Sequence, residues 1–281
     1  MLNLIVNADD FGISEKVNEG IYNAFTHGIL TSTSIIANGR AFDHAVGIYK
    51  TIQDLDVGVH LTLLEEQPVA DRNQIPTLLT SGGSFKKNAT NFTKDYFLGK
   101  INLDEVLYEF EAQVLKIKNS GIPISHMDSH QHIHMLPGIF KIAVALARKH
   151  NIPAIRIPYE RPRWYMLKKS GMFTRFLQLL VLNKFCRYST LSGLISTNYF
   201  VGFYYSGNLK HEHLKRILQD IPREGFCELI CHPGVDDPDS SYRHWNYQWE
   251  KELEALTHKN VKSFLAENNI ELCTYKQMVE S

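Results

Sequence analysis

The sequence has no net charge, few cysteines and no long apolar run. Thirty lysines and arginines balance thirty aspartates and glutamates, so no overall field attracts nucleic acid. The four cysteines include no CxxC pair, which favours a reducing compartment over a disulfide scaffold. No stretch approaches the roughly 20 apolar residues that span a bilayer, and Asp9 and Asp10 interrupt the first apolar run too early for a signal peptide. We therefore expect a cytoplasmic protein with no nucleic-acid partner.

The chain instead alternates short apolar runs with amphipathic segments. Hydrophobic residues make up 44% of its 281 residues, an ordinary globular value. The apolar runs predict strands at 2–8, 28–38, 56–63, 123–128, 153–159, 226–232 and 270–275. Apolar residues that recur near the 3.6 period predict helices within 14–28, 102–121, 136–150 and 246–268. This alternation predicts an α/β fold, with a parallel sheet covered by helices in one domain over 1–281.

Polar residues near the strand ends favour a barrel over an open sheet. Asp9 and Asp10 follow the first predicted strand, and His60 lies in the third. Arg156 lies in the fifth strand, and His232 ends the sixth. In a parallel barrel all strand C-termini open onto one rim, whereas an open sheet gathers ligands near its switch point. Contributions from so many strands therefore predict a barrel of about seven parallel strands.

The segment 123–138, PISHMDSHQHIHMLPG, is rich in histidine. Within nine residues it carries His126, Asp128, His130, His132 and His134. At the two-residue repeat of a strand, all five side chains point to the same side. Metal sites and proton-transfer sites gather histidine and aspartate this densely. We therefore interpret the segment as part of a functional site.

Three of the strand-end residues suit a catalytic metal. Such a site takes about three protein ligands and keeps an open position for water. We predict Asp10, His60 and His130 as the ligands. His130 is chosen because it lies at the end of a strand, before Pro137 begins a helix. Asp128 is predicted to orient a ligand imidazole.

Asp9 and His232 suit proton transfer beside that metal. Asp9 adjoins a ligand, so it can remain ionised next to the metal and act as general base. His232 is not needed as a ligand and can act as general acid. The predicted catalytic pair is therefore Asp9 and His232.

Five short motifs resemble the YdjC-like carbohydrate deacetylases, which include the chitooligosaccharide deacetylases. The motifs are NADDFG at 7–12, GVHLTL at 58–63, HMDSHQHIHMLP at 126–137, RIP at 156–158 and HPG at 232–234. The resemblance implies a distorted (β/α) barrel related to the polysaccharide deacetylases. It also implies the same metal ligands, base and acid as above, and a homodimer.

By this resemblance the protein is an enzyme that removes the acetyl group from an N-acetylated sugar and releases acetate. One divalent metal is expected: the ligand set suits zinc, manganese, cobalt or iron, and the resemblance keeps magnesium open. Arg156, His132 and Tyr159 are predicted to contact the substrate, with a structural salt bridge as the alternative for Arg156. A metal-dependent phosphoesterase is a second candidate, although it would favour two metals and more ligands. A non-catalytic metal-binding protein is a third.

The stretch from 161 to 211 contains no aspartate or glutamate and includes the apolar run MFTRFLQLLVLNKFCR. Its basic residues up to 187 are Arg161, Arg163, Lys168, Lys169, Arg175, Lys184 and Arg187. One interpretation is a buried barrel helix with a basic rim. The other is a basic apolar insertion that meets anionic lipid or a lipid-linked substrate. The second predicts apolar surface beside the active-site mouth and peripheral contact with the inner face of the membrane.

Overall fold

The computed structural model describes residues 1–281 except 168–172, 188–192 and 239. Among the described residues, strands form one sheet in which all the ladder pairings are parallel. They are β1 (Leu2–Phe11), β2 (Ser32–Ile35), β3 (Asp56–Leu61), β4 (His126–Ser129), β5 (Ala154–Ile155), β6 (Tyr199–Val201), β7 (Gly225–Cys231) and β8 (Ile270–Leu272). The order across the sheet is β5-β4-β3-β2-β1-β7-β6, and β8 pairs with the beginning of β1.

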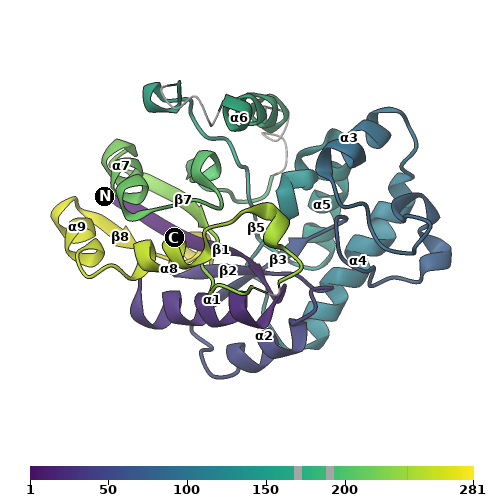
Figure 1. Cartoon of the computed structure of the whole chain (residues 1–281), viewed down its shortest axis with the longest axis horizontal. Coiled ribbons are helices and arrows are strands. Elements are labelled where there is room, and N and C mark those ends of the chain that lie inside the picture. Colours follow the sequence, from purple (N-terminus) through teal and green to yellow (C-terminus); the bar gives the residue numbers. More distant parts are fainter. Residues whose placement is uncertain (168–172, 188–192, 239) are drawn as a thin grey trace.

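The sheet curls into an incomplete barrel at the centre of the molecule (Figure 1). Its outer strands are β5 and β6, and the described residues include no ladder between these two strands. Seven strands form the continuous path. The predicted distorted barrel of about seven parallel strands is therefore confirmed, with an opening between β5 and β6.

Helices of the described chain surround the sheet (Figure 1). They are α1 (Glu15–His27), α2 (Phe42–Tyr49), α3 (Ala89–Phe97), α4 (Leu103–Asn119), α5 (Pro137–Lys149), α6 (Phe173–Cys186), α7 (His211–Asp220), α8 (Trp249–Thr257), α9 (Val261–Glu267) and α10 (Tyr275–Glu280). Within the described ranges, no helix is both long enough and apolar enough to cross a membrane.

Local sequence explains where several helices begin. The Ser14 side chain accepts a hydrogen bond from the Val17 N–H at the start of α1, as a helix N-cap should. Pro137 occupies the first turn of α5, where its missing N–H leaves no hydrogen bond unmade. The Thr274 side chain caps α10, so the predicted strand 270–275 was too long: it ends at Leu272.

The sequence patterns did not predict several other short helices and strands correctly. The predicted helix 246–268 is two helices, α8 and α9, separated at 258–260. Strand β6 has only three residues, too few to show a period. Helices α2, α3, α7 and α10 were also not predicted. Helix α3 lies in the long connection between β3 and α4.

Alternate residues of β1 face two different cores. One face belongs to the main hydrophobic core of the molecule. On the other face, Ile5 packs with Tyr275 and Met278 of α10. Asn7 and Asp9 follow Ile5 on this second face. This face of β1 is therefore apolar at Ile5 and polar toward the C-terminal end of the strand.

Candidate active site

Four strands bring ionisable side chains together at their C-terminal ends. Asp9 and Asp10 of β1 lie beside His60 of β3 and His130, which directly follows β4. His130 Nδ1 lies 2.9 Å from Asp10 Oδ1, and His60 Nε2 lies 3.5 Å from the same oxygen. His232, directly after β7, lines the same cavity. The structure thus gathers the residues that the strand ends predicted.

A β-bulge lets two consecutive aspartates serve one site. Neighbours on a regular strand point to opposite faces, but the pairing of β1 with β2 shifts register between Ala8 and Phe11. Asp10 has a φ of 70° at this point. Bulges of this kind re-aim side chains next to active sites. Asp9 consequently contacts Arg156, while Asp10 contacts the two histidines.

Asp10, His60 and His130 fit a divalent metal. Their ligand atoms all lie within 4.8 Å of one another. Asp10 Oδ2 is buried and has no hydrogen-bond partner among the described residues, which is unusual for a buried carboxylate oxygen. His60 Nδ1 lies 2.7 Å from Asp128 Oδ1, so Nε2 is left to face a metal. The donor set therefore suits the predicted ion.

A second group of possible ligands is already occupied by an arginine. Asp9, His60 and Asp128 have the same close spacing. However, Arg156 Nη1 lies 2.8 Å from Asp9 Oδ2 and 2.7 Å from Asp128 Oδ2. A second cation there would meet the guanidinium charge at close range. The described residues therefore offer one metal site at this rim.

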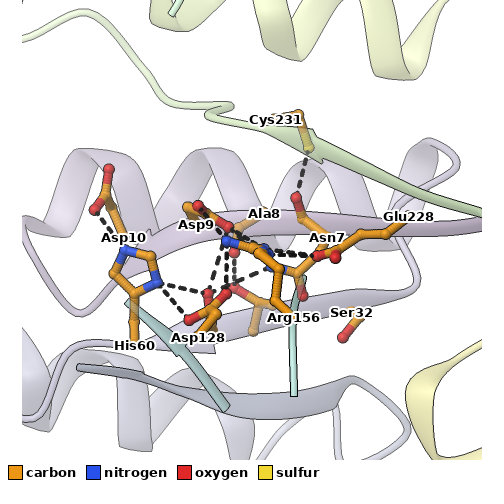
Figure 2. Close-up of polar contacts among 12 residues, drawn as sticks. Asn7, Ala8, Asp9, Asp10, Ser32, His60, Asp128, Arg156, Glu228 and Cys231 are labelled. Carbon is orange, nitrogen blue, oxygen red and sulfur yellow. Dashed lines mark hydrogen bonds and ion pairs between the residues drawn. The ribbon is translucent and has the colours of Figure 1, made fainter. Parts of the chain in front are cut away.

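Arg156 is fully buried and lies among the carboxylates of Asp9, Asp128 and Glu228 (Figure 2). Besides the two Nη1 contacts, Nη2 donates to Asp9 Oδ1 at 2.7 Å. Nε donates to Glu228 Oε1 at 2.8 Å, and Nη2 lies 2.7 Å from that oxygen. Three of these contacts are hydrogen bonds, and the other two are close ion pairs. Arg156 therefore forms the buried ion pairs that were the alternative to a substrate contact, and it does not line the cavity described below.

The arginine keeps its neighbouring carboxylates ionised. Burial raises the pKa of Asp9, but Arg156 and His60 outweigh burial and hold that pKa well below its usual range. The same balance lowers the pKa of Asp128 to about 2. Burial lowers the pKa of His60. The negative charges of Asp128 and Asp9 outweigh burial and raise the pKa of His60 to about 9. A metal that binds His60 must therefore displace a proton.

His232 contacts Glu252 of α8 and the ring of Tyr247. Its backbone N–H donates to Glu252 Oε2 at 2.5 Å, and its Nδ1 lies 3.9 Å from that oxygen. The Tyr247 ring packs edge-on against the imidazole, with centroids 4.9 Å apart. His232 is only 5% exposed, and its Nδ1 has no hydrogen-bond partner among the described residues, so packing rather than a side-chain hydrogen bond places the ring at the cavity.

A cavity of about 620 Å³ reaches the candidate ligands His60 and His130, the candidate base Asp9 and the candidate acid His232. This volume is in the usual range for small-molecule sites. Its walls come from α3, the 130–136 segment, α6 and the loop before α8. Phe203, Trp245 and Tyr247 supply aromatic surface. The cavity can therefore take a ligand much larger than an acetyl group.

The histidines of 126–134 do not share one face, so that prediction was wrong. The chain turns after β4, and His132 has a φ of 55°. His126 stacks on Tyr275, with ring centroids 3.8 Å apart. His130 and His132 line the cavity, whereas His126 and His134 do not.

Tyr159 does not lie in this cavity either. It is 39% exposed and lines two separate hollows beside residues 193–201. The reason is its position after β5, at the open edge of the barrel. Of the three predicted substrate contacts, only His132 therefore lines the cavity, and Tyr159 lies outside it.

Several residues of the site were not predicted. Trp245 Nε1 donates to both carboxylate oxygens of Glu65, at 2.9 and 3.0 Å. The aromatic run SYRHWNYQW at 241–249 was a visible signal for this wall. Glu228 and Glu252 had no such signal, because Glu228 is one acid within an apolar strand and Glu252 is one of three glutamates in an ordinary helix.

Helix α6 lies beside the cavity with apolar side chains exposed. Leu177 and Val181 line the cavity and are 46% and 56% exposed. Phe173 and Leu180 are also exposed, and Phe176 is half-buried. The predicted apolar surface beside the active-site mouth is therefore confirmed for α6.

The fold and site define a parallel (β/α) half-barrel with one candidate metal site at the C-terminal ends of its strands. A family model described as YdjC-like protein matches residues 3–267. The chain therefore belongs to the YdjC-like family.

Relatives match the chain over nearly its whole length. A carbohydrate deacetylase of Clostridium beijerinckii is 31% identical over 99% of this chain and 100% of the relative. A chitooligosaccharide deacetylase of Proteus mirabilis is 30% identical, with 98% of each chain covered. A solved structure of an Enterococcus faecalis protein is 26% identical, covers 98% of each chain and has a TM-score of 0.76. The Enterococcus faecalis structure therefore shares the half-barrel fold of this chain over nearly its whole length.

Proposed function

We propose that the protein is a metal-dependent N-deacetylase, which removes the acetyl group from an N-acetylated sugar and releases acetate. The main support is one cavity that combines a single candidate metal site with an ionised carboxylate and an imidazole. The names of the relatives, carbohydrate deacetylase and chitooligosaccharide deacetylase, support a sugar as substrate.

Asp10, His60 and His130 would hold one divalent ion, such as zinc, magnesium, manganese or cobalt. When bound, such an ion lowers the pKa of a water molecule and polarises a carbonyl group. Asp128 orients His60 through its Nδ1 atom, and oriented imidazoles bind metals more tightly.

Asp9 is the proposed general base. Arg156 contacts both of its carboxylate oxygens, which keeps Asp9 ionised and fixes its direction. An ionised carboxylate in the cavity can take a proton from the attacking water. Because the geometry is set before substrate binds, little reorganisation is needed during the reaction.

His232 is the proposed general acid. An amide nitrogen leaves poorly unless it receives a proton. His232 lines the cavity, and Glu252 holds it in place. Protonation of the departing nitrogen by His232 would give the free amino sugar and acetate.

The two alternative functions have less support. A phosphoesterase of the two-metal type needs a second ion about 4 Å from the first, and Arg156 occupies the second group of possible ligands. A non-catalytic metal-binding protein has no need for Asp9 and His232 in the same cavity.

A substrate panel tests the proposal. The purified protein with and without added metal would be incubated with N-acetylated sugars and, separately, with phosphate esters. We expect mass spectrometry to show loss of acetyl from a sugar, with equal amounts of free amine and acetate, and only when metal is present. Phosphate release without acetyl loss would establish the phosphoesterase instead.

We also propose that the sugar carries an apolar chain, and that α6 meets this chain and an anionic membrane surface. Aliphatic side chains such as Leu177 and Val181 offer no hydrogen bonds to a sugar ring, yet they line the cavity and are exposed. The stretch 161–211 has no acid to repel anionic lipid. Each Lys or Arg near such a surface contributes about 1 kcal/mol, less at high salt.

Two comparisons test the apolar chain. Wild type should deacetylate an octyl glycoside of an N-acetyl sugar at least tenfold more efficiently than the methyl glycoside, since each buried methylene contributes about 0.8 kcal/mol. Leu177→Gln with Val181→Gln should remove that preference. Leu107→Gln with Leu115→Gln, at exposed positions of α4, should not. Equal efficiency on both glycosides in wild type would refute the apolar chain.

Membrane contact has its own test. Wild type should sediment with anionic liposomes at low salt and be released at high salt. Neutralising Arg175 together with Lys168 and Lys169, which lie outside the described residues, should weaken that binding. Absence of binding at low salt would refute the contact.

Two further expectations stay predictions from the sequence. We expect a homodimer, which analytical ultracentrifugation of the purified protein would detect. We expect a cytoplasmic location, which cell fractionation would detect, with the membrane-bound share rising as salt is lowered.

A further inference from the structure

Beyond Arg156, a buried chain of contacts continues to the C-terminal helix. Glu228 Oε1 accepts from Arg156 Nε at 2.8 Å, and Glu228 Oε2 accepts from the Tyr275 hydroxyl at 2.6 Å. Tyr275 is the first residue of α10, and its N–H donates to Asp56 Oδ2 at 2.8 Å. Both Glu228 and Tyr275 are fully buried. The phenol is therefore fixed at its backbone and at its hydroxyl.

His126 and Gly58 support the phenol ring. The His126 ring stacks on the Tyr275 ring with an interplanar angle of 13°. A Cβ at position 58 would lie 2.4 Å from atoms of the His126 ring, so only glycine leaves room for the imidazole there. His126 does not line the cavity and belongs to neither group of possible metal ligands. Its place under Tyr275 is thus a packing role.

We propose that Tyr275, acting through Glu228, is a positioning residue for the general base. Asp9 binds one edge of the Arg156 guanidinium, and Glu228 binds the other edge. The orientation of Glu228 therefore sets the orientation of Arg156, and Arg156 sets that of Asp9. The inference rests on the proposed function, because it takes Asp9 as the base.

Removing one hydroxyl breaks this chain without touching the cavity. In Tyr275→Phe the stacked ring remains, but Glu228 Oε2 loses the one side-chain donor that the described residues give it, since the arginine binds Oε1. Glu228 is fully buried, and a buried acceptor that loses its donor carries a desolvation cost. Glu228 and the guanidinium then rotate, and a base displaced by a fraction of an ångström reacts more slowly. We expect kcat to fall roughly tenfold to a hundredfold, with KM unchanged because Tyr275 does not meet the substrate.

A matched tyrosine controls for the loss of a buried hydroxyl. Tyr204 is fully buried, and its hydroxyl donates to the Met166 carbonyl oxygen at 2.7 Å, outside the Arg156 chain. For wild type, Tyr275→Phe and Tyr204→Phe, we would measure kcat, KM, bound metal and melting temperature. Both variants should melt at similarly reduced temperatures and keep full metal, and only Tyr275→Phe should lose kcat.

Two results would overturn the proposal. One is a kcat for Tyr275→Phe equal to that of Tyr204→Phe. The other is a fall in kcat that is accompanied by a matching loss of metal, because the hydroxyl would then act on the ligands rather than on the base.

A spectroscopic readout separates this inference from the proposed function. In protein with isotope-labelled arginine, the Arg156 Nε–H resonance, assigned with Arg156→Lys, should be protected from solvent exchange in wild type and in Tyr204→Phe. It should lose protection in Tyr275→Phe. If wild type deacetylates no sugar, the proposed function fails, and unchanged protection in Tyr275→Phe would independently reject the positioning role.

Discussion

Replacing Asp9 by asparagine separates the proposed base from the metal ligand beside it. The change removes a charge that accepts two hydrogen bonds from Arg156, at 2.8 and 2.7 Å. Asparagine can accept only one of them, and its amide hydrogens then face the guanidinium. Because Asp10 keeps its contacts with His60 and His130, we expect Asp9→Asn to retain metal and to lose roughly 10²-fold or more in kcat.

The stability effect of Asp9→Asn should be moderate. Breaking a buried ion pair costs about 3–5 kcal/mol, but Arg156 keeps Asp128 and Glu228 as partners, so we expect the lower end of that range. At about 2–4 °C per kcal/mol for a chain of this size class, the melting temperature should fall by several degrees. Asp10→Asn is the matched control, since it should lose metal.

The assay combines kcat, metal content and thermal melting for both variants. Asp9→Asn with more than a tenth of wild-type kcat would refute the base assignment. Loss of metal in Asp9→Asn, together with full metal in Asp10→Asn, would show that the two aspartates have exchanged roles.

Two other predictions concern residues outside the metal cluster. Burial raises the pKa of Glu160 from 4.5 to about 7. The folded chain therefore holds a proton that the unfolded chain releases, and the free energy of unfolding should fall by up to about 3 kcal/mol as pH rises from 4.5 to 7. Urea unfolding of Glu160→Gln should lack this part of the pH dependence, and an unchanged profile would contradict the account. Gly58→Ala should displace His126 and lower kcat, whereas Gly47→Ala, with open space around it, should not; equal kcat values would reject the packing role of Gly58.

The sequence predicted the site residues at the C-terminal ends of the strands better than the buried residues that support them. Asp9, Asp10, His60 and His232 stand out because each is polar at the end of an apolar run, and parallel strands bring such ends together. His130 was found in the same way, although the parity argument for its neighbours failed. That argument assumed an extended chain, and the backbone turns at Gln131 and His132.

The layer beneath the rim could not be predicted from local patterns. Arg156, Glu228 and Tyr275 are far apart in the sequence and meet only after β5, β7 and α10 are assembled. Glu228 in FCELIC reads as the solvent-facing position of an alternating strand, yet it is fully buried. Tyr275 was placed at the end of a strand, and only the Thr274 cap converts it into the start of a helix.

Metal analysis of ligand variants tests the central claim most directly. Wild type, His60→Ala, His130→Ala and the exposed control His27→Ala would be dialysed against the same metal, and bound metal and acetate release would be measured on each sample. We predict one ion per chain and full activity in wild type and His27→Ala, with both quantities lost in the two ligand variants, because two ligands hold the ion poorly. Full metal occupancy in both His60→Ala and His130→Ala, or acetate release from metal-free wild type, would contradict the account.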